Sequence, residues 1–144
     1  MSATAYLDTL TNTAAFDPSV QNAAAALAPS KETLQAAIDA ALAMDETAAT
    51  LSGEQAEVLK KGFEYATQVV KMLTKEPAPE EKLDLYKYFK RANNETPAQP
   101  SMFNFEAKYK YNAWKEISHI SEQKALVLYI KQVDALISKY GTRS

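Results

Sequence analysis

Helical periodicity, broken by proline and capping residues, is the feature that most constrains the fold of this chain. Large apolar residues recur three and four positions apart in successive segments, which is the spacing of one helix face. The alternating pattern of a β-strand is not seen in the sequence. We therefore predict an all-α protein, and 144 residues suit one ordinary domain or a small domain with an extension.

Four helices are predicted in the second part of the chain, and together they make a small bundle. Ser52 with Gln55 three residues later is typical of a capping box, and Pro77 ends the helix that follows. Pro79 begins the next helix, and Ser121 is expected to cap the last one. The predicted spans are 52–76, 79–93, 104–118 and 121–140.

Residues 1–54 are predicted to be an acidic extension rich in Ala and Thr, followed by the bundle domain at 55–144. One amphipathic helix is expected at about 30–44, with Ser30 as its N-cap. Because its apolar stripe is narrow, a docked and a loosely attached extension both remain open, and so do a cover over the ligand site, a partner contact and dimerisation. Residues 1–29 are expected to be weakly ordered, with these docking points: Tyr6, Leu7, Leu10 and Phe16.

The net charge of −2 conceals an asymmetry between the two parts of the chain. Residues 1–60 carry eight acidic and two basic residues, whereas residues 61–144 carry ten acidic and fourteen basic ones. The basic part is the natural place for an anionic ligand. Nucleic-acid binding is a weaker interpretation, because the chain is acidic overall and has no basic stripe.

Several function classes are disfavoured by residue types. The absence of cysteine excludes disulfides and thiol nucleophiles, and a single histidine, His119, excludes a multi-histidine metal site. Since nothing marks a third partner beside Ser118 and His119, we predict that the protein is not an enzyme. No apolar run reaches the ~18 residues of a membrane span, and the N-terminus lacks a signal-peptide pattern, so we expect a cytoplasmic protein without stable membrane insertion.

The segment LYKYFKRANNE (85–95) combines aromatic and basic residues on one predicted helix. A helical wheel gives it three sectors: an apolar face with Leu85, Tyr88 and Ala92, a second with Leu83, Tyr86, Phe89 and Lys90, and a charged strip with Asp84, Lys87 and Arg91. We assign the first sector to the core and the third to solvent. An aromatic platform with a lysine suits a ligand that has a flat ring and a phosphate. The alternative is a second core face from which Lys90 reaches solvent.

The segment KYKYNAWKEI (108–117) repeats this mixture and favours the ligand interpretation. Lys110 and Trp114 are four residues apart and share a helix face. Tyr129 on the last helix and Lys71 on the first add further aromatic and basic groups beside apolar faces.

These motifs resemble the acyl-CoA-binding protein family over about residues 55–144. The resemblance rests on YKYFKRA (86–92), KYNAW (110–114) and ALVLYI (125–130), in the order and spacing of that family. It implies a four-helix bundle that binds long-chain fatty acyl-CoA without catalysis or a cofactor. The expected roles are the transport and buffering of this ligand, by a monomer that serves acyl-CoA-using enzymes. The alternative is a helical regulatory module whose extension gates or replaces ligand binding.

The resemblance also implies roles for particular residues. It assigns the nucleotide end of the ligand, including the 3′-phosphate, to Tyr86, Lys90 and Lys110, with Phe89 near the adenine. Lys71 and Tyr129 would complete that set, and Trp114 would pack inside the bundle. The acyl chain would be bordered by Phe63, Ala66, Thr67, Val70 and Leu83.

This chain departs from the family pattern at Asn93-Asn94-Glu95-Thr96, where a glycine is usual, and at Ser101 after Pro100. Phe89 stands where tyrosine is common. We expect these differences to affect the rim of the site and the chain-length preference.

Overall fold

The computed structural model describes residues 4–44, 51–97, 99–101 and 103–142. Over these ranges its regular structure is helical, apart from one isolated β-bridge between Leu73 and Thr142. The all-α prediction is confirmed. Within the same ranges, no helix is both long enough and apolar enough to cross a bilayer.

The four helices predicted after residue 52 are all present. They are α4 (Gly53–Val69), α5 (Pro79–Ala92), α6 (Phe105–Glu116) and α7 (Glu122–Tyr140), with a short 3-10 turn, η3 (Val70–Met72), after α4. Pro79 occupies the first turn of α5, where its missing N–H is not needed. Gly141 follows α7 with a φ of +75°, a conformation that favours glycine at a helix end.

Only part of the predicted capping is correct. The Ser121 side chain accepts a hydrogen bond from the Lys124 backbone N–H at 3.0 Å, as predicted. Ser52 and Ser30 occupy the N-cap positions of α4 and α3, as predicted, but neither side chain makes a capping hydrogen bond. Ser30 is the last residue of a 3-10 turn that runs directly into the helix it was expected to cap.

The N-terminal extension is helical over most of its described length. Its elements are α1 (Thr4–Asp8), η1 (Thr9–Thr11), α2 (Pro18–Leu27), η2 (Ala28–Ser30) and α3 (Lys31–Ala43). The prediction of weak order before residue 30 is therefore wrong for residues 4–29. Small alanine side chains explain the difference, because Ala24, Ala37 and Ala41 are fully buried and let the helices approach closely. The four predicted docking points, Tyr6, Leu7, Leu10 and Phe16, are all buried.

Polar contacts as well as apolar packing fix the extension to the bundle. The Tyr6 hydroxyl donates to the Gly62 carbonyl of α4 at 2.5 Å, and the Tyr6 backbone N–H donates to Asp134 Oδ1 of α7 at 2.9 Å. Lys124 Nζ donates to the Leu42 carbonyl at 2.9 Å, where it satisfies the C-terminal end of α3. The extension is thus docked, which decides between the two possibilities left open by the sequence.

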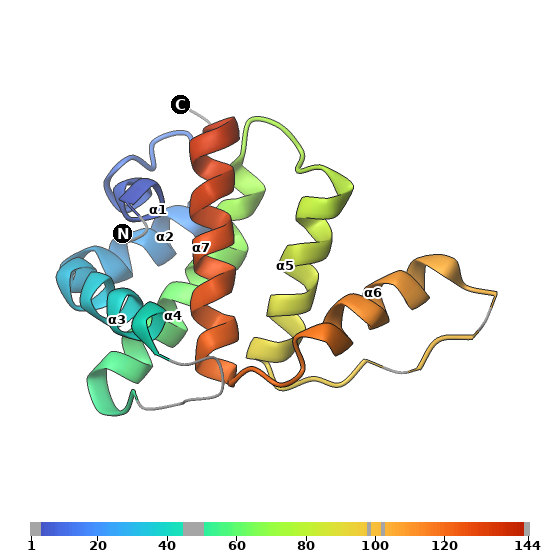
Figure 1. The fold of residues 1–144 in the computed structure, drawn as a ribbon. Coiled ribbons are helices and arrows are strands. Elements are labelled where there is room, and N and C mark those ends of the chain that lie inside the picture. The colour runs from blue at the N-terminus through green and yellow to red at the C-terminus, as the bar shows by residue number, and fades with distance from the viewer. Residues whose placement is uncertain (1–3, 45–50, 98, 102, 143–144) are drawn as a thin grey trace.

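Figure 1 shows how the elements are arranged around the central pair α4 and α7. The extension helices cover one side of this pair, and α5 packs on the other side, mainly against α7. Helix α6 packs on α5 and projects away from the rest of the molecule. The extension therefore lies on the side of the bundle opposite to α5 and α6.

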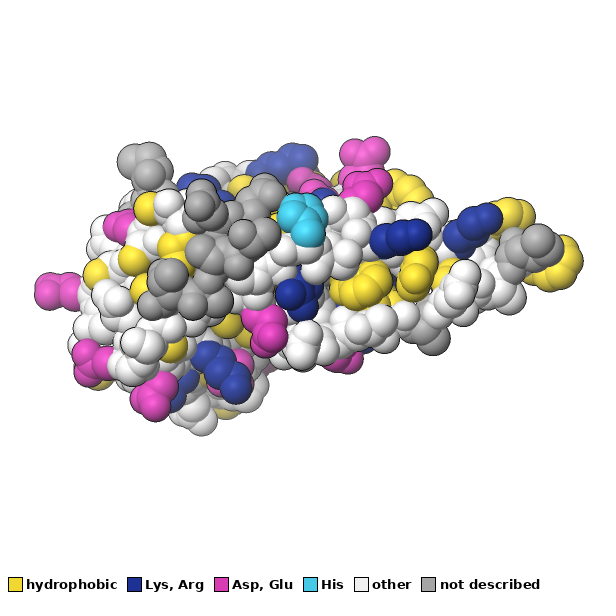
Figure 2. Space-filling view, turned by 60° about the horizontal axis from the view of Figure 1, so that its bottom comes forward, with side chains coloured by type: hydrophobic (Ala, Val, Ile, Leu, Met, Phe, Trp, Pro, Cys, Tyr) yellow, Lys and Arg dark blue, Asp and Glu magenta, His cyan; other side chains and the backbone are white. Residues whose placement is uncertain are grey.

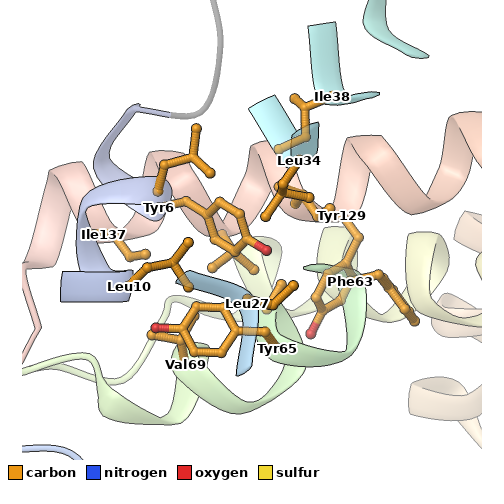
Figure 3. Close-up of a cluster of buried hydrophobic side chains, with 14 of the residues drawn as sticks. Tyr6, Leu10, Leu27, Leu34, Ile38, Phe63, Tyr65, Val69, Tyr129 and Ile137 are labelled. Atoms are coloured by element: carbon orange, nitrogen blue, oxygen red, sulfur yellow. The ribbon is translucent and has the colours of Figure 1, made fainter. Parts of the chain in front are cut away.

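One hydrophobic core joins the extension to the bundle. Figure 3 shows Tyr6 of the extension facing Tyr65 of α4, with Leu34 beside Tyr6 and Ile38 beyond it; all four belong to one buried cluster. The cluster also contains Val127, Ile130 and Val133 of α7. A single core of this kind makes the extension part of the folded unit.

A polar clamp holds the start of α5 against the end of α7. The Glu81 carboxylate accepts from the Tyr140 hydroxyl at 2.6 Å, from the Ala78 backbone N–H at 2.8 Å and from Lys139 Nζ at 3.0 Å. These bonds lower the pKa of Glu81 to about 2, with the Tyr140 bond as the main cause. Because α5 has no fully buried residue, the clamp supplies part of its attachment.

Candidate ligand-binding groove

Helices α5 and α6 enclose a surface groove made of two adjoining hollows. One hollow, of about 410 Å³, is lined mainly by Leu83, Tyr86, Tyr109 and Lys110. The other, of about 440 Å³, is lined by Tyr86, Lys90 and Lys110 among others. Since Tyr86 and Lys110 belong to both, the hollows form a continuous groove. The first hollow is the more apolar of the two, and the second adds Lys90.

Three predicted nucleotide-binding residues meet in this groove. Two ammonium groups lie near the Tyr86 ring, with Lys110 Nζ 5.4 Å and Lys90 Nζ 5.8 Å from its centroid. Both distances are within the range of a cation–π contact. Tyr86 and Lys90 share one face of α5, and Lys110 reaches them from α6. The arrangement brings one aromatic ring and two cations together.

Each of these lysines is also paired with a carboxylate. Lys90 Nζ lies 3.2 Å from Glu95 Oε1, and Lys110 Nζ lies 3.4 Å from Glu106 Oε1. All four side chains are partly exposed, so the pairs contribute little to stability. They matter for the charge that a ligand meets in the groove.

Phe89 and Tyr129 lie on the inner side of α5. The Phe89 ring is 5.9 Å from that of Phe63 and 6.3 Å from that of Tyr129, and the Phe63 and Tyr129 rings meet edge to face at 5.1 Å. Burial raises the pKa of the Tyr129 hydroxyl to about 12. Phe89 is thus half-buried against the core. Of the aromatic residues of α5, Tyr86 is the one that lines the two hollows described above.

The other predicted site residues lie on α4 and η3 or at the entrance of α5. Val70 and Lys71 line a third hollow of about 420 Å³, and Lys82 lines both this hollow and the apolar end of the groove. Phe63 and Ala66 are buried in the core, while Thr67 is half-buried and donates to the Glu64 carbonyl at 2.6 Å. The predicted acyl-chain residues therefore do not line one cavity together.

The charged strip on α5 is less exposed to solvent than predicted. Arg91 is half-buried, and its Nε donates to the Ile120 carbonyl at 2.6 Å. The Lys87 side chain is 18% exposed and lies 3.2 Å from Asp84. Both cations were predicted to face solvent, but the segment that leads into α7 covers the part of α5 from which Arg91 projects.

Trp114 was expected to pack inside the bundle, and His119 was not expected to be catalytic. Trp114 is half-buried, its ring lies 5.8 Å from that of Tyr111, and its indole N–H is buried without a hydrogen-bond partner in the described structure. His119 is exposed in the turn between α6 and α7. Among the residues that can be described, no cluster of three or more potential metal ligands occurs.

Sequence reasoning missed several groove residues. Lys82, Glu106 and Tyr109 line the apolar hollow, but no role was predicted for any of them. The i,i+4 spacing of Glu106 and Lys110 was a readable signal for their pairing. Figure 2 shows basic and hydrophobic side chains side by side along the projecting arm, where Phe103, Phe105 and Tyr109 are largely exposed.

Comparisons with known proteins identify the family of the chain. The family model "Acyl CoA binding protein" matches residues 60–133, which is just over half of the chain. Acyl-CoA-binding protein 2 of Saccharomyces pastorianus is 34% identical over 82 residues, which are 56% of this chain and 94% of that protein.

Two animal proteins give similar values. Acyl-CoA-binding protein homolog 1 of Caenorhabditis elegans is 36% identical over 81 residues, covering 55% of this chain and 94% of its own length. The acyl-CoA-binding protein homolog of Drosophila melanogaster is 36% identical over 87 residues, which are 58% of this chain and 100% of that protein. The chain, with its helical bundle and its matching central segment, therefore belongs to the acyl-CoA-binding protein family.

Proposed function

We propose that this protein is a non-catalytic carrier that binds, buffers and transports long-chain fatty acyl-CoA esters. The observation that carries the proposal is the position of Lys90 and Lys110 beside the Tyr86 ring, in the groove between α5 and α6. Family membership and the names of the relatives support acyl-CoA as the ligand.

The nucleotide end of the ligand is assigned to the basic end of the groove. Lysines are suitable point charges for phosphate, and a tyrosine hydroxyl donates to a phosphate oxygen while its ring packs on an adenine. We assign these contacts to Tyr86, Lys90 and Lys110. Lys71, beside the third hollow, would supply a further charge, and Phe89 and Tyr129 would support the groove from its inner side.

The acyl chain is assigned to the apolar region around the entrance of α5. Leu83 lines one hollow there and Val70 another, and Lys82 lines both hollows. Phe63, Ala66 and Thr67 of α4 would form the inner border of this region. Such a groove would shield hydrocarbon from water, and that effect is the main source of affinity for a long chain.

The extension supports the carrier rather than the gated-module alternative. A gate would have to reach the groove, whereas α1–α3 lie on the opposite side of α4 and α7. We propose that residues 55–144 are the ligand-binding domain and that residues 1–54 stabilise it from the side opposite to the groove. A cytoplasmic monomer that delivers acyl-CoA to the enzymes that use it fits this division.

Calorimetric titration of the full chain with acyl-CoAs of graded length tests the proposal. Affinity should rise with chain length, by at most about 0.8 kcal/mol for each buried methylene, until the groove is filled. Free CoA and free fatty acid serve as controls and should bind more weakly. If no acyl-CoA binds more tightly than free CoA, the protein is not a carrier of this kind.

A further inference from the structure

Two carboxylates form ion pairs with the lysines that are assigned to the phosphate. Glu95 Oε1 is 3.2 Å from Lys90 Nζ, and Glu106 Oε1 is 3.4 Å from Lys110 Nζ. Glu106 also lines both hollows of the groove. A phosphate that binds Lys90 and Lys110 must therefore displace both carboxylates or lie close to them.

Local structure holds Glu95 in this position. Its backbone N–H donates to the Lys90 carbonyl at 2.9 Å, which closes the turn directly after α5. Asn94 takes a φ of +54° in this turn, and its side chain accepts from the Arg91 guanidinium at 3.1 Å. The segment in which this chain departs from the family pattern thus brings a carboxylate to Lys90.

Helix geometry places the second carboxylate. Glu106 precedes Lys110 by four residues on α6, the spacing at which opposite charges meet on a helix surface. Asn104 caps the same helix by accepting from the Ala107 N–H at 3.0 Å, so the first turn is fixed. Both pairs are therefore set by the backbone of this chain.

We propose that Glu95 and Glu106 set the charge preference of the groove. They compete with phosphate for the two lysines and repel a second negative group, which weakens binding of a ligand with a 3′-phosphate more than binding of the same ligand without it. The result is a carrier that releases its ligand more readily than the lysines alone would allow. This inference rests on the proposed function and on the site assigned there.

The test is calorimetry on three full-length proteins: wild type, Glu95→Gln with Glu106→Gln, and Glu116→Gln. Glu116 is an exposed carboxylate of α6 that lines none of the described hollows, so its replacement reports the effect of removing one negative charge outside the groove. Each protein is titrated with palmitoyl-CoA and with palmitoyl-3′-dephospho-CoA. Circular dichroism confirms that the helices are retained.

The double variant should bind palmitoyl-CoA more tightly than wild type does, by about twofold to fivefold for each replacement. Its gain for the dephosphorylated ligand should be clearly smaller, and the control should match wild type for both. Equal gains of the double variant for the two ligands would overturn this inference alone. The same holds if the double variant shows no gain while wild type binds normally. Absence of binding by every protein would overturn the proposed function, and this inference with it.

Discussion

The two sides of the α4–α7 pair differ in how completely their side chains are buried. On the extension side, Tyr6, Leu34 and Ile38 are fully buried and join one continuous core. On the other side, α5 has no buried residue in this structure, and Ala113 is the one buried residue of α6. The difference separates a packed scaffold from a half-exposed surface that a ligand can reach.

This comparison predicts that stability and binding respond to different substitutions. Buried apolar area is the main source of folding free energy, so changes on the extension side should lower stability. Groove residues are partly exposed and should be replaceable with little effect on folding. The substitutions below test whether the two sides are independent in this way.

Leu34→Ala should have the largest effect. Leu34 is fully buried against α4, and removing most of its side chain should lower the free energy of unfolding by about 2–5 kcal/mol. Urea unfolding measures this loss. Asp39→Ala, on the exposed face of α3, is the matched control and should change stability by less than about 0.5 kcal/mol. Equal effects of the two substitutions would mean that the extension is not packed as described.

Lys110→Ala should affect binding rather than folding. Loss of a charge-assisted bond to phosphate should weaken acyl-CoA binding by about 1.5–3 kcal/mol, and Lys90→Ala should behave similarly. Calorimetry measures the affinity, and urea unfolding checks that stability is retained. Lys60→Ala, an exposed lysine of α4, controls for net charge. Normal binding by both groove variants would place the phosphate elsewhere.

Gly62→Ala tests the contact between the extension and α4. Whether the substitution raises or lowers stability depends on that contact. An added Cβ would lie 2.6 Å from Leu34 Cδ1 and 3.0 Å from the Tyr6 hydroxyl oxygen. This overlap should cost about 1–3 kcal/mol and exceed the ~1 kcal/mol that alanine gains over glycine in a helix. We expect a net loss of stability by thermal or urea unfolding. A gain would show that nothing packs on Gly62, and the loss should shrink in a Leu34→Ala background.

We expect the Glu81 clamp to make the stability of the protein depend weakly on pH. The pKa of Glu81 is lowered from 4.5 to about 2 in the folded chain, so its stabilising contribution is present above pH 4.5 and is lost as the pH falls toward 2. Glu81→Gln should therefore differ from wild type most above pH 4.5, and the two curves should converge in acid. Unfolding curves from pH 7 to pH 2 measure this. A constant difference over the whole range would contradict the lowered pKa.

Several helix ends were predictable from local sequence, but the order of the extension was not, and α4 with η3 stops at Met72 rather than just before Pro77. Pro79 and Gly141 act through their backbone conformation and Ser121 through its own side chain, so their helix ends could be read from sequence. Ala24 and Ala37 contribute little to an apolar pattern, yet both are fully buried where helices approach closely. That burial depends on neighbours distant in sequence, which periodicity does not identify.

The site could be predicted only in part, for the same reason. Motif spacing identified Tyr86, Lys90 and Lys110, and the structure brings them together. A helical wheel gave Arg91 a direction but could not show that the Ile120 carbonyl lies within hydrogen-bond distance. Contributions from Lys82 and Tyr109 likewise depend on how α5 packs on α6.

Palmitoyl-CoA titration of Leu34→Ala beside the Lys90→Ala, Lys110→Ala double variant tests the separation of scaffold and site most directly. We predict that folded Leu34→Ala binds within about threefold of wild type. The double variant should lose at least about tenfold in affinity while it unfolds at the wild-type urea concentration. Binding lost in Leu34→Ala and kept in the double variant would contradict the account, because the ligand would then depend on the extension side.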